Sequence, residues 1–110
     1  ILAECRDYRG AANRSYYAFF HAMRSVFALD NQDFSKHSGV ASNFRKDFIK
    51  SGIFEVKFSD MIKSAFYIRN NSDYDDFYVI VKADVEEQIQ NAEEFCAAVR
   101  TYLEGKKVTL

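Results

Sequence analysis

The residues best suited to chemistry stand in one short segment past the middle of the chain. Arg69 and Asn70 are followed by Asp73 and Tyr74 and then by two further aspartates. An arginine guanidinium can bind a phosphate through two parallel hydrogen bonds, with polar neighbours completing the contact. Asn and Asp are equally typical of a helix end, where their side chains satisfy free backbone groups. The spacing alone leaves both interpretations open.

A second group of basic and aromatic residues follows the helix that we predict over residues 11–29. Apolar residues at three- and four-residue spacing define its buried face, namely Tyr16, Phe19, Phe20, Met23, Val26 and Phe27. The opposite face carries Arg14, Tyr17, His21 and Arg24. Rings and arginines together suit single-stranded RNA, because rings stack on bases while arginines bind phosphates. Alternatively, this face packs against another helix and its basic groups reach outward to solvent.

The composition predicts one all-α domain over residues 1–110. With 110 residues, 48% hydrophobic residues, 11 Phe and 7 Tyr, the chain has enough ring surface for one core and too little length for two. It contains no proline and only four glycines, so the usual breakers of long helices are scarce. Because the chain begins at Ile1 rather than Met, we expect the N-terminal helix to be truncated.

Charge and cysteine usage narrow the function further. The net charge of −1 lacks the positive field of a duplex-binding protein, so any contact with nucleic acid must be local. Cys5 and Cys96 are far apart and match no zinc or redox spacing, which predicts free, mostly buried thiols in a reducing cytoplasm. We find no phosphate-binding glycine loop, serine triad, paired histidine ligands or membrane span in the sequence. We therefore expect no metal or cofactor and a cytoplasmic protein.

Capping and breaking residues divide the chain into the elements that must position these groups. The expected boundaries, in chain order, are Gly10, Ser35, Gly52, Ser59, Arg69, Asp84 and Gly105. Residues 77–81 (FYVIV) favour an extended connector, because they are consecutive aromatic and β-branched residues. In the last helix the pattern predicts that one face is buried, consisting of Val85, Ile89, Ala92, Cys96, Val99 and Leu103.

Four segments in succession resemble the HEPN family, most closely its small stand-alone branch, whose members are often encoded beside a minimal nucleotidyltransferase. These segments are residues 13–22 (NRSYYAFFHA), 36–40 (KHSGV), 69–74 (RNNSDY) and 92–95 (AEEF). The resemblance extends from about residue 7 to residue 103. It implies an up-and-down bundle of four to five helices that forms a homodimer.

The resemblance also implies a site at the dimer interface. In active relatives an Arg-polar-x-x-x-His motif from each subunit cleaves RNA without a metal ion, with the histidine acting on the ribose 2′-hydroxyl. By position, Arg69 matches the arginine, Asn70 the polar residue and Tyr74 the histidine. A tyrosine, with an ordinary pKa of about 10, stays protonated at neutral pH, whereas histidine titrates there. Nearby carboxylates such as Asp73 would raise the pKa of a phenol further.

A related tyrosine in some HEPN proteins is modified with AMP by the partner enzyme. It stands two residues beyond the histidine, a position that Asp76 occupies here. Tyr74 remains as a substitute acceptor.

Two functions follow as hypotheses. In the first, the chain is the helical half of a toxin–antitoxin pair with a nucleotidyltransferase partner, and it is either a metal-independent ribonuclease or a degenerate relative of one. In the second, it is a non-catalytic dimeric module that binds nucleotide or RNA, or that scaffolds the partner enzyme. The histidine-to-tyrosine departure at Tyr74 favours the second hypothesis, and the family context favours the first.

Overall fold

The described part of the chain is a bundle of α-helices. The computed structural model describes residues 2–29, 32, 36–74 and 82–109, without the side chains of 2–9, 37–38, 72–74 and 107–109. Its elements are α1 (Leu2–Ala28), α2 (His37–Phe44), the π-helical turn η1 (Arg45–Ile49), α3 (Lys57–Tyr74) and α4 (Lys82–Thr109). This confirms the predicted all-α bundle of four to five helices.

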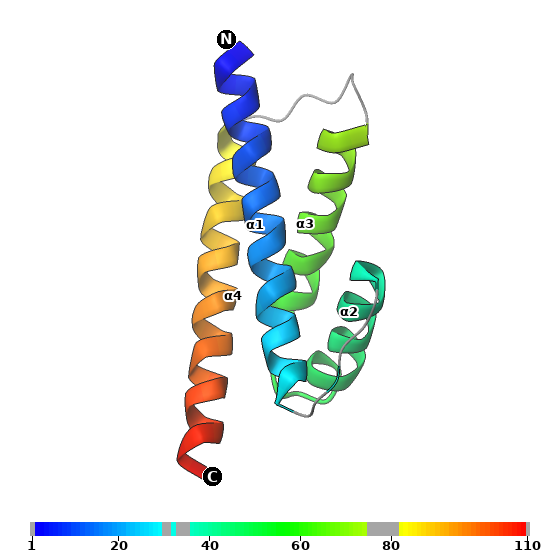
Figure 1. Cartoon of the computed structure of the whole chain (residues 1–110), viewed down its shortest axis with the longest axis vertical. Coiled ribbons are helices and arrows are strands. Elements are labelled where there is room, and N and C mark those ends of the chain that lie inside the picture. Colours follow the sequence, from blue (N-terminus) through cyan, green and yellow to red (C-terminus); the bar gives the residue numbers. More distant parts are fainter. Residues whose placement is uncertain (1, 30–31, 33–35, 75–81, 110) are drawn as a thin grey trace.

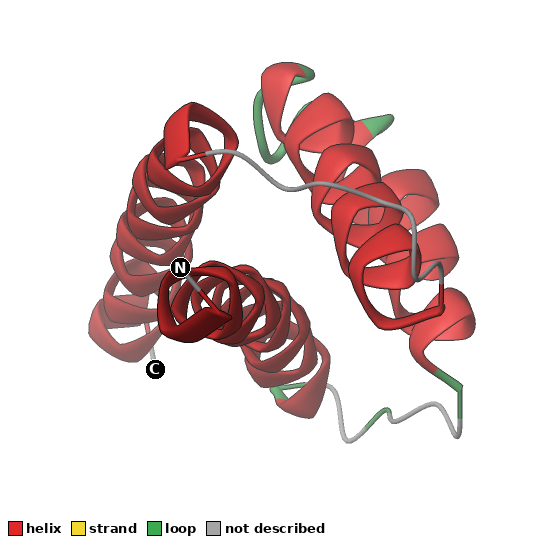
Figure 2. Ribbon diagram, turned by 90° about the horizontal axis from the view of Figure 1, so that it is seen from above, coloured by secondary structure: helices red, strands yellow, loops and turns green. Residues whose placement is uncertain are grey.

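Helix α1 is the element that joins the others. It lies beside α4, which runs in the same direction, and beside α3, which runs in the opposite direction (Figure 1). Viewed from above, α4 lies to one side of α1 and the pair formed by α2 and α3 to the other (Figure 2), and α3 and α4 also contact each other. Every side chain that the sequence assigned to its buried face is at most 6% exposed. That prediction is confirmed.

The start of α1 differs from the prediction at Gly10. We expected a helix boundary there, but α1 continues without interruption from Leu2 to Ala28. One interior glycine costs about 1 kcal/mol relative to alanine, and the packing of a helix of 27 residues outweighs this cost. Gly10 also leaves room for a neighbouring side chain, since a Cβ atom there would lie 3.3 Å from Nη1 of Arg14.

The core is built mainly from phenylalanine rings of different elements. Phe44 of α2 is fully buried, and its ring centroid lies 5.3 Å from those of Phe48 and Phe54. Phe95 of α4 lies 5.5 Å from Phe44, in an edge-to-face arrangement. Such ring pairs each contribute about 0.5–1.5 kcal/mol beyond the area that they bury. Ring packing therefore joins α2, η1, the following turn and α4.

The helical segment formed by α2 and η1 ends where the sequence predicted. In η1 the backbone N–H of Lys50 donates to the carbonyl oxygen of Arg45 at 2.8 Å, and the wider turn lets the consecutive residues Phe48 and Ile49 both be buried. Gly52 follows with a φ of +90°, a conformation that favours glycine. The predicted cap Ser35 lies outside the described residues.

The predicted ends of α3 and α4 were wrong by several residues. Helix α3 begins at Lys57 rather than at Ser59 and continues past Arg69 to Tyr74. Helix α4 begins at Lys82, before Asp84, and continues beyond Gly105. Polar residues suit a helix interior as well as a helix end, and this chain has no proline to force a stop. The predicted connector at residues 77–81 lies outside the described residues.

The buried face of α4 is turned slightly from the one that we predicted. Val85, Ala92 and Val99 are buried as expected, but Ile89 is 38% exposed, and Cys96 and Leu103 are half-buried. Phe95, at 0% exposure, contributes the ring that fills the core instead. A large ring dominates the packing, so the helix orients around it rather than around the smaller apolar residues. No helix among the described residues is long and apolar enough to span a membrane.

Replacing Phe95 with alanine should lower the free energy of unfolding by about 3–5 kcal/mol, because it leaves a cavity in the core. The ring of Phe95 lies 5.2 Å from Phe19 and 5.3 Å from Phe58. Urea denaturation followed by circular dichroism measures the change. Ile89→Ala on the same helix is the matched control and should cost much less, because Ile89 is partly exposed. Equal losses in the two variants would contradict the core described above.

Two glycine substitutions should change stability in opposite directions. Gly52→Ala should destabilise the chain by about 1–2 kcal/mol, because a Cβ atom is strained at the φ of +90°. Gly105→Ala lies inside α4, where a Cβ atom meets nothing within 4 Å, and should stabilise by about 0.5–1 kcal/mol. Thermal unfolding of both variants beside the wild type tests the pair. A shift of both in the same direction would be incompatible with these backbone conformations.

Candidate functional site

Arg69 lies on α3 against two consecutive tyrosines of α1. Its guanidinium carbon is 4.7 Å from the ring centroid of Tyr16 and 5.8 Å from that of Tyr17. Tyr16 is 1% exposed and is held edge-to-face by Phe66, with centroids 4.8 Å apart. A guanidinium within about 6 Å of a ring face is attracted by the ring's negative face. Arg69 is therefore half-buried and positioned by the core rather than extended freely into solvent.

Three of the four predicted binding residues on α1 form a connected series of contacts with Arg69. The rings of Tyr17 and His21 are nearly parallel, with centroids 6.0 Å apart and an angle of 28°. Phe20 lies 5.5 Å from His21, and the guanidinium carbon of Arg24 lies 5.6 Å from the ring centroid of Phe20. We call the series Arg69, Tyr17, His21, Phe20 and Arg24 the cation–aromatic row. It has an arginine at each end.

Exposure within the cation–aromatic row is graded. Phe20 is buried, Tyr17 and Arg69 are half-buried, and His21 and Arg24 are exposed. The row thus has a side fixed in the core and a side open to solvent. An open face of rings and cations is the kind of surface on which unpaired bases and phosphates bind.

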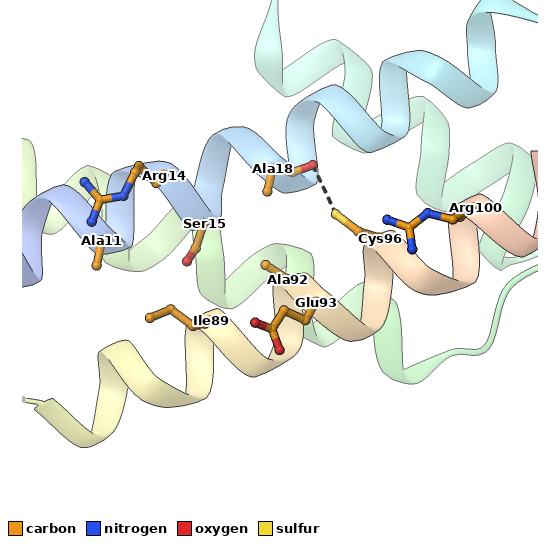
Figure 3. Close-up of a pocket in the computed structure, with 9 residues that line it drawn as sticks. All are labelled: Ala11, Arg14, Ser15, Ala18, Ile89, Ala92, Glu93, Cys96 and Arg100. Carbon is orange, nitrogen blue, oxygen red and sulfur yellow. Dashed lines mark hydrogen bonds between the residues drawn. The ribbon is translucent and has the colours of Figure 1, made fainter.

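Arg14 lies apart from the other predicted residues of α1, in a groove between α1 and α4. The α1/α4 groove has a volume of about 520 Å³ and is lined by Ala11, Arg14, Ser15, Ala18, Ile89, Ala92, Glu93, Cys96 and Arg100. Arg14 and Arg100 lie near its two ends (Figure 3). The sequence analysis did not single out Arg100, because an isolated basic residue on a polar helix face carries no local signal.

Cys96 is the residue of the α1/α4 groove that carries a thiol, and its surroundings determine how reactive that thiol is. Its thiol is free, and Sγ lies 3.9 Å from the carbonyl oxygen of Ala18 (Figure 3). Burial raises the pKa of the Cys96 thiol, and the nearby charge of Arg100 offsets this only in part. A raised pKa disfavours the nucleophilic thiolate. Cys96 is therefore not an activated nucleophile in this groove. The side chain of the other cysteine, Cys5, lies outside the described residues.

The segment after Arg69 is helical rather than a loop. Asn70 is exposed, and the side chain of Asn71 donates a hydrogen bond to the carbonyl oxygen of Tyr67 at 2.8 Å. Backbone positions 73 and 74 lie one turn beyond Arg69 and Asn70, because α3 extends to Tyr74. The side chains of Asp73 and Tyr74 lie outside the described residues. Their predicted roles therefore stay predictions.

The described part of the chain offers no metal-binding site. Among the side chains that the structure describes, no three His, Cys, Asp or Glu residues lie close enough together to hold an ion.

Comparison with known proteins identifies the family. The family model described as the HEPN domain matches residues 1–102. A UPF0332 protein of Thermotoga maritima is 31% identical over 97% of this chain and 81% of its own length. A candidate toxin of Methanocaldococcus jannaschii is 30% identical over 92% of this chain and 69% of its own length. No solved structure gives a significant match. The chain belongs to the HEPN domain family.

Proposed function

We propose that this chain is the RNA-cleaving half of a toxin–antitoxin pair. Its membership of the HEPN family and its similarity to a protein named as a candidate toxin support this assignment. The partner that we propose is a small nucleotidyltransferase, in keeping with the branch that the sequence resembles.

The observation that carries the proposal is the contact of Arg69 with the tyrosine rings of α1. A guanidinium held 4.7 Å from the Tyr16 ring centroid keeps its position without substrate, so little ordering is required when a phosphate binds. The half-buried ring of Tyr17 contacts the guanidinium, and the exposed ring of His21 stacks on Tyr17, where it would contact an unpaired base. This arrangement suits a single-stranded RNA better than a duplex, whose bases are already stacked on each other.

The proposed chemistry is metal-independent cleavage at a site shared by two copies of the chain. Arg69 would bind the non-bridging oxygens of the scissile phosphate and stabilise the charge that develops there. Asn70, exposed one position further along α3, would add an amide hydrogen bond. Tyr74 stands at the position where active relatives carry histidine.

A non-catalytic role is the second candidate, and residue 74 is the observation that favours it. A phenol with an ordinary pKa of about 10 is a poor proton acceptor at neutral pH. In this role the dimer would bind a nucleotide or an RNA end through Arg69 and Tyr17, or scaffold the nucleotidyltransferase. Tyr74 would then serve as an acceptor for modification by the partner.

Arg69→Ala should abolish RNA cleavage and weaken RNA binding. Loss of a preorganised charge contact lowers the rate by about 100-fold or more, and loss of a charged hydrogen bond weakens affinity about tenfold or more. A labelled single-stranded RNA, followed on gels and by fluorescence anisotropy, gives both values. Arg100→Ala is the matched control, because Arg100 is an exposed arginine that lies in the α1/α4 groove, outside the cation–aromatic row. It should retain wild-type cleavage.

The outcomes of this experiment separate the two candidates. Intact RNA after incubation with the purified wild-type protein at neutral and alkaline pH would rule out the ribonuclease. RNA or nucleotide binding that is lost in Arg69→Ala would then support the non-catalytic module. Unchanged affinity in Arg69→Ala would contradict the binding module, and unchanged cleavage would contradict the ribonuclease.

The shared site requires two copies of the chain, so the 12.8 kDa protein should sediment as a dimer at micromolar concentrations. The exposed side of α1 that bears His21 and Arg24 is the surface that we propose for this contact or for the substrate. Analytical ultracentrifugation over a concentration series measures the mass. A monomer throughout the series would remove the composite site.

A further inference from the structure

His21 and Arg69 are distant in sequence but contact the same ring. The guanidinium carbon of Arg69 is 5.8 Å from the centroid of Tyr17, and the imidazole of His21 is 6.0 Å from it. Arg69 is on α3 and His21 is on α1, so the packing of these helices creates the pairing. His21 is exposed, so its ring is accessible from solvent.

We propose that His21 is the proton acceptor for RNA cleavage in this chain. The inference rests on the proposed ribonuclease function and names the residue that carries out its proton transfer. It assigns this role to α1, whereas the position on α3 that holds histidine in active relatives is Tyr74 here.

The cation–aromatic row provides a path for the substrate. Arg69 binds one phosphate, and the adjoining nucleoside lies over Tyr17 with its ribose toward His21. Arg24, 5.6 Å from the Phe20 ring centroid, is placed for the next phosphate along the strand. Arginines at the ends and rings between them match the alternation of phosphate and base in a single strand.

The reaction balances without any further reagent. The neutral imidazole of His21 takes the proton of the ribose 2′-hydroxyl, and the 2′ oxygen attacks the adjacent phosphorus. The bond from phosphorus to the 5′ oxygen breaks, and that oxygen takes a proton from water. The hydroxide left behind takes the proton from the imidazolium and restores neutral His21. The products are a 2′,3′-cyclic phosphate and a 5′-hydroxyl.

Other described groups are less suited to this proton transfer. Tyr17 carries a phenol, which is a weaker proton acceptor than an imidazole. Cys96 lies in the α1/α4 groove, and burial raises the pKa of its thiol. Histidine is the side chain whose charge changes between about pH 5 and 8, which suits exchange of a proton at working pH. His21 is the described imidazole that contacts the same ring, Tyr17, as Arg69 does.

Chemical rescue tests the inference directly. His21→Ala and His21→Gln are compared with the wild-type protein on a labelled single-stranded RNA, with and without free imidazole. Loss of a general base should lower the cleavage rate at saturating RNA by about 100- to 10,000-fold, a larger change than the loss of RNA affinity, measured by anisotropy, that follows from removing one stacking ring. Added imidazole should restore part of the rate in His21→Ala and none in Arg69→Ala. His21→Gln keeps a polar side chain of similar length and serves if the alanine variant folds poorly.

Each alternative result overturns a defined part of the proposal. If the wild type cleaves RNA and Arg69→Ala does not, but both His21 variants keep the wild-type rate, only the role of His21 is wrong. If the His21 variants lose affinity and rate together and imidazole restores nothing, His21 binds RNA without transferring a proton, and the inference fails. If the wild type leaves RNA intact, the ribonuclease function fails and the role of His21 fails with it.

Discussion

Ring packing around Phe44, Phe54 and Phe95 is the constraint on which the rest of the structure depends. These rings come from α2, from the turn after η1 and from α4, and each is at most 5% exposed. A close-packed core accepts only one arrangement of such large rigid groups. The orientation of α4 follows from it, because Phe95 must face inward and Ile89 is thereby left partly exposed.

The orientation of α1 follows from the same core and determines the candidate site. Consecutive helical residues point about 100° apart, so burying Tyr16 places Tyr17 at the boundary between core and solvent. A single guanidinium, that of Arg69, can then contact both rings. The site is thus a direct extension of the core, and a change in the packing of α1 would move Arg69 and His21 relative to each other.

The sequence predicted the bundle and the buried face of α1, because the three- and four-residue spacing of apolar residues extends over many positions. One ambiguous position does not change such a pattern. It failed at helix ends such as Gly10 and Arg69, where the predicted signal was one residue and tertiary packing outweighed it. It also grouped Arg14 with Tyr17, His21 and Arg24. Periodicity assigns residues to one side of a helix, but it does not say which neighbouring helix each will meet. In the structure Arg14 lies in the groove between α1 and α4, whereas Tyr17 contacts Arg69 of α3.

The small net charge limits how the proposed site could attract RNA. With a net charge of −1, the chain has no long-range positive field, so in the proposed function RNA affinity would come from contacts within the cation–aromatic row. Two arginines that bind phosphates would release few counterions from the RNA, so they would contribute little to affinity. Stacking on Tyr17 and His21 would not depend on counterion release. Stacking requires an unpaired base. Because stacking would contribute more to affinity than charge contacts with phosphates, the proposed site would favour single strands. In the proposed function, selectivity for single strands would thus follow from the modest charge of the chain.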